Sequence, residues 1–158
     1  MKPIAVLWVG RRASDAWQDL IEDYIGRIHR FAALTDIRVR PAGGRDGDRG
    51  RALGEEAAAL TSHLGEGDFV VALDEHGRER TTIELARLLS ERMPTRRVVF
   101  ILGSDLGLDP QVRTRADEVL ALSRMTLPHH LARLLLCEQL YRALDLTAGG
   151  PYHRGSSR

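Results

Sequence analysis

The 158-residue sequence has one cysteine, one lysine and no long apolar run. Cys137 has no second cysteine in the chain to pair with, which excludes an internal disulfide and fits a reducing compartment. No apolar stretch approaches the roughly 20 residues that a membrane-spanning helix needs. The N-terminus enters a strand-like segment without a cleavage-site pattern, so we expect no signal peptide. We therefore expect a cytoplasmic protein that makes no membrane contact.

The sequence also lacks a strong charge of either sign. Lysine and arginine number 23 against 22 aspartate and glutamate, which leaves a formal net charge of +1. This balance argues neither for nor against a polyanionic partner, although proteins that bind free RNA through its phosphates usually carry a larger basic excess. All the basic residues except Lys2 are arginine, and arginine binds phosphates and stacks on bases wherever it is suitably placed.

Several signature motifs are absent. The sequence Gly-Ser-Asp-Leu-Gly at 103–107 has neither the three-glycine spacing of a dinucleotide fingerprint nor the Gly-Lys-Ser/Thr of a Walker loop. No histidine and cysteine spacing matches a structural zinc pattern, and we expect no metal. Without an internal repeat or a low-complexity linker, the chain is predicted to form a single domain over residues 1–158.

Strand-like and helix-like segments alternate along the chain. Ser14 is a candidate N-cap, Thr81 and Glu84 have the spacing of a capping box, and Pro128 suits the first turn of a last helix. Strands are predicted at 4–10, 35–41, 68–74, 97–103 and 118–123, and helices at 14–28, 55–64, 81–92, 110–116 and 128–146, with a glycine-rich mobile loop over 40–54. This alternation predicts an α/β sandwich with a mostly parallel sheet.

Ligands of such folds bind at the carboxyl ends of the strands, which makes the segments 73–75, 102–104 and 122–123 candidates. The small residues of 103–107 let the backbone approach a ligand and offer amide donors, although a plain strand-to-helix turn has the same composition. Asp74 and Glu75 either hold a ribose or an amine, or are solvated turn residues.

The C-terminal third holds further candidates. His129 and His130 precede a helix that carries Arg133 and Arg142, and one helical turn places His129 and Arg133 on the same face. Glu138 with Arg142 is either a surface pair or part of a site. The segment Tyr152-His153-Arg154 follows Gly149-Gly150-Pro151. As a chain terminus it is either disordered or, if ordered, a source of stacking, a proton acceptor and a phosphate contact.

Taken as one ordered series, these motifs resemble the RlmH family, the large-subunit ribosomal RNA methyltransferases that act at N3 of a pseudouridine. The resemblance covers essentially the whole chain. Its blocks are Pro41-Ala42-Gly43, Leu73-Asp74-Glu75-x-Gly77, a strand ending in Gly103 with Gly107, Leu122-Ser123-x-x-Thr126-Leu127-Pro128-His129, Glu138-Gln139-Leu140-Tyr141-Arg142-Ala143 and Pro151-Tyr152-His153-Arg154.

The resemblance implies a SPOUT-type α/β fold with a C-terminal trefoil knot, the knot and cofactor pocket lying at about 68–158. It also implies a homodimer whose partner subunit helps to complete the site, S-adenosylmethionine as the cofactor, and 23S rRNA in the assembled 70S ribosome as the substrate. The cofactor-binding residues that it implies are Leu73, Gly103, Ser104, Leu122, Ser123, Arg124, Met125, Thr126 and Leu127. One departure is that Ser104 takes the place of the family's second glycine and is followed by Asp105, which either repels RNA phosphate or faces the cofactor sulfonium.

Chemical reasoning adds roles for the catalytic candidates. The N3 proton of a uracil-type ring must leave during or before methyl transfer, and histidine is the usual base for such a step. His153 is our first candidate for this base and His129 our second. Arg142 or Arg154 can stabilise the negative charge that develops on the ring carbonyls, and Tyr152 can stack on the target base.

Three alternatives remain open at this stage. The chain can be a SPOUT methyltransferase that modifies another RNA, such as a tRNA. It can also be a non-catalytic ribosome-binding homologue, an alternative that the Ser104-Asp105 departure suggests. The third alternative is an unrelated nucleotide-binding α/β module.

Overall fold

The computed structural model describes residues 1–43 and 48–154, and in these residues five strands alternate with five helices. The strands are β1 (Ile4–Val9), β2 (Leu34–Val39), β3 (Phe69–Glu79), β4 (Val98–Leu102) and β5 (Glu118–Ala121). The helices are α1 (Asp15–Ile28), α2 (Arg49–Thr61), α3 (Thr82–Arg92), α4 (Pro110–Arg115) and α5 (His129–Thr147). The predicted α/β sandwich is confirmed.

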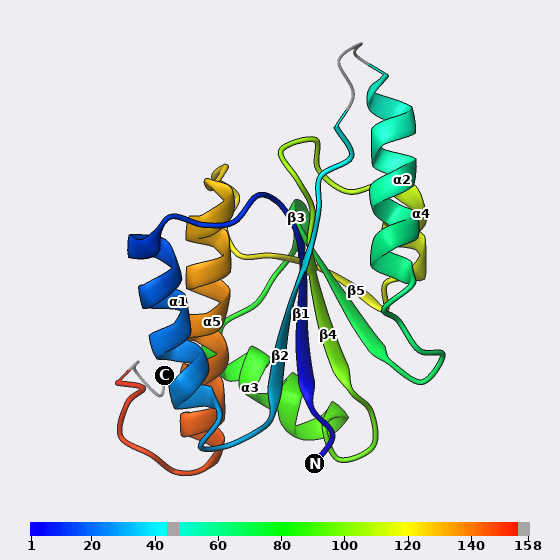
Figure 1. Cartoon of the computed structure of the whole chain (residues 1–158). Helices are drawn as coiled ribbons and strands as arrows, with labels where there is room; N and C mark the ends of the chain where they lie inside the picture. The colour runs from blue at the N-terminus through cyan, green and yellow to red at the C-terminus, as the bar shows by residue number, and fades with distance from the viewer. Residues whose placement is uncertain (44–47, 155–158) are drawn as a thin grey trace.

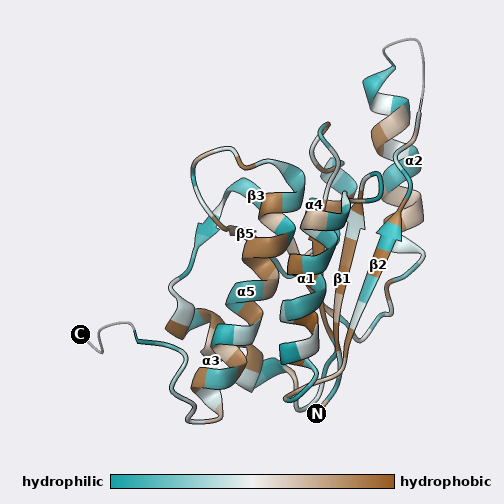
Figure 2. Ribbon diagram, turned by 60° about the vertical axis from the view of Figure 1, so that its left-hand side comes forward, coloured by the Kyte–Doolittle hydropathy of each residue, from teal (hydrophilic) through white to brown (hydrophobic). Residues whose placement is uncertain are grey.

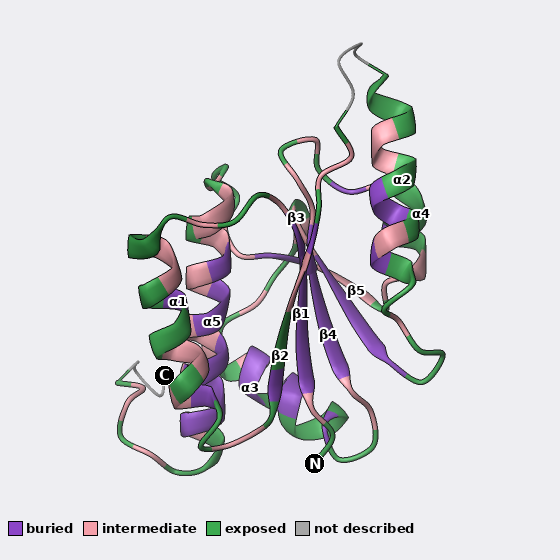
Figure 3. Cartoon of the chain, in the orientation of Figure 1, coloured by how far each residue is buried: buried purple, intermediate pink, exposed green. Residues whose placement is uncertain are grey.

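The sheet has the order β2-β1-β4-β3-β5, and every pair of neighbouring strands is parallel. Helices α1, α3 and α5 cover one face, and α2 and α4 cover the other (Figure 1). All residues of β1 and β4 are buried, as continuous apolar strands between two helical layers require. The edge strand β2 is more exposed (Figure 3) and mixes hydrophilic with hydrophobic residues (Figure 2), because Thr35, Asp36 and Arg38 interrupt its apolar residues.

The N-termini of three helices test the capping residues predicted from the sequence. At α3 the capping box is present, with Thr81 accepting from the amide of Glu84 at 3.1 Å and Glu84 accepting from that of Thr81 at 2.7 Å. Ser14 occupies the N-cap position of α1, but its side chain makes no capping hydrogen bond. Pro128 is the N-cap residue of α5, one position before the first helical turn in which it was predicted.

Two predicted boundaries are wrong. Helix α2 begins at Arg49, not at residue 55, because Asp48 caps it by accepting from the amide of Arg51 at 3.0 Å. The predicted mobile loop over 40–54 is therefore wrong for residues 49–54, whereas residues 44–47 lie outside the described part of the chain. Strand β3 continues to Glu79 instead of ending at 74.

The longer β3 changes partners where it was expected to end. Its pairing with β4 stops at Leu73, and its register with β5 shifts between Leu73 and Arg78. Within this irregular stretch the backbone of Gly77 lies so close to Val119 that an added Cβ would lie 2.7 Å from the Val119 carbonyl carbon. Strands β3 and β4 therefore separate just beyond Leu73, and the space between them is available to a ligand.

Candidate functional site

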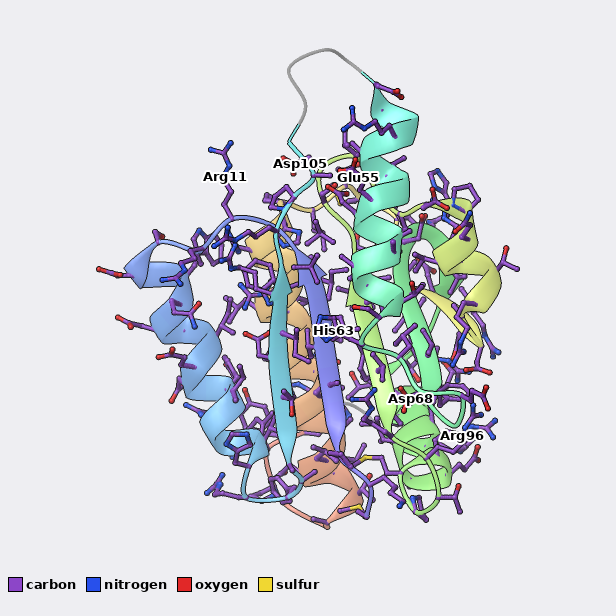
Figure 4. All side chains as sticks on the ribbon, turned by 45° about the vertical axis from the view of Figure 1, so that its right-hand side comes forward. Arg11, Glu55, His63, Asp68, Arg96 and Asp105 are labelled. Atoms are coloured by element: carbon purple, nitrogen blue, oxygen red, sulfur yellow. The ribbon has the colours of Figure 1, made fainter. Side chains whose placement is uncertain are left out.

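A crevice lies where β3 and β4 separate, at the carboxyl ends of the strands. Its volume is about 450 Å³, within the range of small-molecule sites. Leu73, Leu102 and Leu122 supply apolar walls from the ends of β3 and β4 and from the segment after β5. Asp105 lies at this end of the molecule, whereas Asp68 and Arg96 lie at the opposite end (Figure 4). The three strand ends predicted from the sequence do converge.

One wall of the crevice is the turn over 103–107. The amide of Gly107 donates to the Ser104 carbonyl at 2.8 Å, and Gly107 has a φ of +85°, which favours glycine. A Cβ on Gly103 would overlap the backbone of Gly107. The turn is thus closed on itself, and both glycines are required for its shape.

The opposite wall is the loop over 122–127. Thr126 donates to the carboxylate of Glu75 at 2.7 Å, and Ser123 accepts from the amide of Met125 at 2.9 Å. Arg124 points outward and pairs with Glu79 at 3.3 Å. All the predicted cofactor-binding residues line the crevice except Arg124, which instead fastens the loop to the extended part of β3.

Charged residues that the sequence analysis did not select also line the crevice. Arg113 of α4 forms an ion pair with Asp74, and the Nδ1 atom of His76 lies 3.1 Å from the same carboxylate. The Asp74 side chain is only 9% exposed. It is therefore neither a solvated turn residue nor a free ligand for an amine. Arg113 and Arg49 come from helices on the α2–α4 face, and no motif or spacing in the sequence signals their presence here.

His129 begins α5 and faces the crevice. Its ring lies 5.5 Å from that of Trp8, and a Cβ on Gly10 would lie 3.0 Å from its Nε2 atom. Burial, together with the neighbouring His130 and Arg133, lowers the pKa of His129 to about 4. The imidazole is therefore neutral near pH 7, and its buried Nε2 atom has no hydrogen-bond partner in the described structure.

Arg133, predicted to share a face with His129, is almost fully buried at 1% exposure. Its guanidinium stacks 3.6 Å from the centre of the Trp8 ring and pairs with Asp36 at 3.0 Å. Its Nη1 atom lies 3.3 Å from Nδ1 of His130. This buried charge anchors the start of α5 to β1 and β2, and so fixes the place of His129.

The depressed pKa of His129 predicts that acid destabilises the fold. The unfolded chain, with a histidine pKa near 6.5, binds this proton more readily than the folded protein does. Stability contributed by neutral His129 is present above pH 6.5 and is lost as the pH falls toward 4. Between pH 7 and pH 5 we expect a loss of about 1 kcal/mol from this ring, allowing for its partial exposure.

Thermal unfolding of the wild-type protein and of His129→Asn at both pH values measures this loss. The fall in Tm between pH 7 and pH 5 should be smaller in the variant. An equal fall in both proteins would show that other groups account for the acid sensitivity.

The remaining catalytic candidates form a separate cluster at the far end of α5. Arg142 lies over the Tyr152 ring at 4.6 Å and donates to Glu138 at 2.9 Å. Tyr152 packs on Tyr141 at 4.6 Å, and its amide donates to Asp145 at 2.9 Å. The ordered alternative for 151–154 is therefore confirmed, and Glu138–Arg142 is more than an exposed surface pair. Residues 155–158 lie outside the described chain.

The length of α5 separates this cluster from the crevice. The helix has 19 residues, which at 1.5 Å per residue span about 28 Å. Of the catalytic candidates only His129 lies at the crevice, while Tyr152 and Arg154 line a second hollow beside Arg30 and Phe31. The Nδ1 atom of His153 is buried and has no hydrogen-bond partner in the described structure.

Residues 1–43 and 48–154 offer no metal site and no reactive thiol. No group of three or more histidine, cysteine, aspartate or glutamate side chains in this part could hold a metal ion. Burial raises the pKa of the Cys137 thiol to about 12, so this residue is a poor nucleophile. None of the described helices has the length and apolar character needed to cross a membrane.

Comparisons with known proteins identify the family of this chain. A family model described as a predicted SPOUT methyltransferase matches residues 1–153. The ribosomal RNA large subunit methyltransferase H of Solidesulfovibrio magneticus is 42% identical over 155 residues, covering 97% of this chain and 99% of the relative. The protein of the same name from Gloeobacter violaceus is 41% identical over 152 residues, covering 96% and 99%.

Solved structures support the fold. A probable methylase family protein from Haemophilus influenzae superimposes with a TM-score of 0.60 at 11% identity, covering 99% of this chain and 72% of the other. A probable methyltransferase from Bordetella pertussis superimposes with a TM-score of 0.57 at 14% identity, covering 90% and 95%. The family resemblance read from the sequence is confirmed: the chain belongs to the SPOUT methyltransferase family, in the group of ribosomal RNA large subunit methyltransferase H.

Proposed function

We propose that the protein transfers a methyl group from S-adenosylmethionine to N3 of a pseudouridine in the 23S rRNA of assembled ribosomes. The names of its relatives support a large-subunit ribosomal RNA as the substrate. The observation that carries the proposal is the crevice between the 103–107 turn and the 122–127 loop. A cleft that combines apolar side chains with backbone-rich walls at the carboxyl ends of parallel strands is suited to a nucleoside.

The crevice fits S-adenosylmethionine in chemical character. This cofactor supplies a methyl group activated by a positively charged sulfur. The glycine turn lets the backbone approach a ligand closely, and Leu73, Leu102 and Leu122 offer apolar contact to an adenine ring. His129 is neutral near pH 7 and Asp105 is a carboxyl side chain on the crevice wall, so neither adds a positive charge that would repel the sulfonium. Of the two roles considered for Asp105, its position on the crevice favours facing the sulfonium.

The Ser104-Asp105 departure does not argue for a non-catalytic homologue. The hydroxyl of Ser104 donates to Glu56 at 2.8 Å, so it is satisfied within the protein. Asp105 lies on the exposed rim of the crevice. Space for the ligand is retained despite both changes, which favours an active enzyme.

The tail cluster is proposed to act on the crevice of a second subunit. Tyr152 packs on Tyr141 and Arg142, which follow His129 by 12 and 13 residues, or about 18–20 Å of helix. None of Tyr152, His153 and Arg154 lines the crevice of its own chain. A symmetric homodimer brings each tail to the partner's crevice without any change in either part. The trefoil knot implied by the resemblance stays a prediction.

Within this arrangement His153 remains the preferred proton acceptor. His129, with a pKa of about 4, is a weak base at neutral pH, and its proposed role is to shape the crevice. The hydrogen bond with Tyr24 and burial raise the pKa of Tyr152 to about 12. Arg142 and Tyr141 already contact its ring, so stacking of Tyr152 on the target base stays a prediction. Arg154 is exposed and free to meet the charge on the substrate, whereas Arg142 is held by Glu138.

The decisive assay measures methyl transfer to 70S ribosomes that lack the modification. Label from S-adenosylmethionine should enter 23S rRNA at N3 of one pseudouridine. Isolated 23S rRNA should be methylated much more slowly, because a net charge of +1 gives little attraction to free RNA. Fully modified ribosomes are the control. Equal rates on isolated rRNA would contradict ribosome dependence, and transfer only to tRNA would favour the alternative substrate.

A further inference from the structure

Glu56 is a buried carboxylate that the catalytic scheme does not use. It lies on α2, on the sheet face opposite α5, and is 4% exposed. No ion pair is found for it within the described residues, although burying a carboxylate is costly unless its oxygens are hydrogen-bonded. The Glu56 side chain therefore needs hydrogen-bond donors for both of its oxygens.

Both carboxylate oxygens of Glu56 accept hydrogen bonds from the ends of two different strands. Oε2 accepts from the amide of Ala42, beyond β2, at 3.0 Å, and Oε1 accepts from the Ser104 hydroxyl, beyond β4, at 2.8 Å. In the sheet these two strands are separated by β1. Glu56 thus joins two strand ends that make no direct pairing with each other.

The hydrogen-bond network extends from Ser104 into the crevice wall. The Ser104 hydroxyl also accepts from the amide of Leu106 at 3.2 Å. Arg49, two helical turns before Glu56 on the same side of α2, donates to the carbonyl of Leu106 at 3.0 Å. Both backbone groups of Leu106 are therefore held by a network that begins on α2, and Leu106 lines the crevice.

We infer that Glu56 is a positioning residue for the crevice: through Ser104 it fixes the 103–107 turn in the shape that presents its backbone to the cofactor. The inference rests on the proposed function, because it takes S-adenosylmethionine as the ligand of this crevice. It also gives a role to the side chain at position 104. A glycine there lacks the hydroxyl that connects Glu56 with Leu106.

The test is calorimetric titration of S-adenosylmethionine into the wild-type protein and into variants of this network, with Tm measured on each. Glu56→Ala should weaken cofactor binding about tenfold, equivalent to about 1.4 kcal/mol. Glu56→Gln should lie between it and the wild type, because the amide can accept from Ala42 and donate to Ser104. Ser104→Ala should weaken binding less than Glu56→Ala, and the double variant should bind no worse than Glu56→Ala alone.

Leu60→Ala is the matched control. Leu60 lies on α2, one helical turn beyond Glu56, and is 1% exposed, so its truncation lowers the Tm through lost core packing. It should bind the cofactor within about twofold of the wild type, since a twofold change is under 0.5 kcal/mol.

The outcomes distinguish failure of the proposed function from failure of the role inferred for Glu56. Wild-type protein that binds no S-adenosylmethionine overturns both the proposed function and this inference. Wild-type binding with unchanged affinity in Glu56→Ala overturns the inference alone, as does a loss in Leu60→Ala equal to that in Glu56→Ala at the same fall in Tm. If Glu56→Ala fails to fold, Glu56→Gln and Ser104→Ala decide by the same comparison.

Discussion

Replacing Gly103 by alanine is expected to weaken binding of S-adenosylmethionine at least a hundredfold, about 2.7 kcal/mol. An added Cβ would lie 2.7 Å from the carbonyl carbon of Gly107 and 3.0 Å from the Leu108 side chain. Neither the backbone of Gly107 nor the buried Leu108 can yield cheaply, so the turn must open and its amides must leave the crevice wall. We expect a fall in stability of about 1–3 kcal/mol as well, which is typical of overpacking.

Gly26→Ala is the control for this substitution. Gly26 lies within α1 and has open space around the position of a Cβ, so alanine there should stabilise the helix by up to about 1 kcal/mol and leave cofactor affinity unchanged. Calorimetric titration of both variants gives the comparison. Wild-type affinity in Gly103→Ala would show that the turn does not contact the cofactor.

Local patterns determine much of this fold. The apolar runs of β1 and β4 and the capping box at Thr81 each point to one structure, and the structure agrees. The predicted start of α2 at residue 55 is too late, because Gly50 and Gly54 are poor helix formers and so favour a loop in this segment. Its first turn is instead stabilised by the Asp48 cap and by the bond from Arg49 to Leu106. The second of these partners is distant in sequence, and no local pattern reveals it.

The candidate site likewise has one part that local sequence patterns predict and another that depends on tertiary contacts. Its backbone-rich walls follow strand ends that the alternation of apolar runs predicts, at 73–75, 102–104 and 122–123, and Gly103 and Gly107 mark one of these walls. Arg49, Arg113 and His76 line the crevice because of how α2, α4 and the irregular part of β3 pack, which depends on tertiary contacts. The predicted helix over 128–146 places its two ends far apart, but the return of Tyr152 onto Tyr141 and Arg142 depends on tertiary contacts.

Replacing His153 by alanine is expected to lower the rate of methyl transfer to ribosomes about 10²–10⁴-fold, the usual contribution of a general base. The side chain lies at the opposite end of α5 from the crevice of its own chain. Cofactor affinity should therefore change little, within about threefold, or under 0.7 kcal/mol. Single-turnover methylation under saturating cofactor and ribosome measures the rate, and titration of S-adenosylmethionine measures the affinity.

His63→Ala is the matched control for the loss of an imidazole. This residue is exposed and does not line the crevice; its carbonyl accepts from Arg97, just before β4, at 2.8 Å. In Figure 4 it lies away from Asp105, and its substitution should leave the single-turnover rate unchanged. If His153→Ala kept the wild-type rate, the proton would have to leave to another group or to water before methyl transfer, and the base would not be on the tail.

Mixing two inactive variants tests whether the tail acts across the dimer. Gly103→Ala has a defective crevice and an intact tail, whereas His153→Ala has an intact crevice and a defective tail. In a mixed dimer the intact crevice of the His153→Ala chain meets the intact tail of the Gly103→Ala chain, so one complete site forms.

Random association makes about half of the dimers mixed, and each mixed dimer has one complete site of two. About a quarter of wild-type activity should therefore return. A tail that served its own crevice would leave every site in the mixture defective, because each chain carries one of the two lesions. Recovery of activity after co-refolding would therefore show that the tail of one chain completes the crevice of another, as proposed from the absence of Tyr152, His153 and Arg154 among the residues that line the crevice.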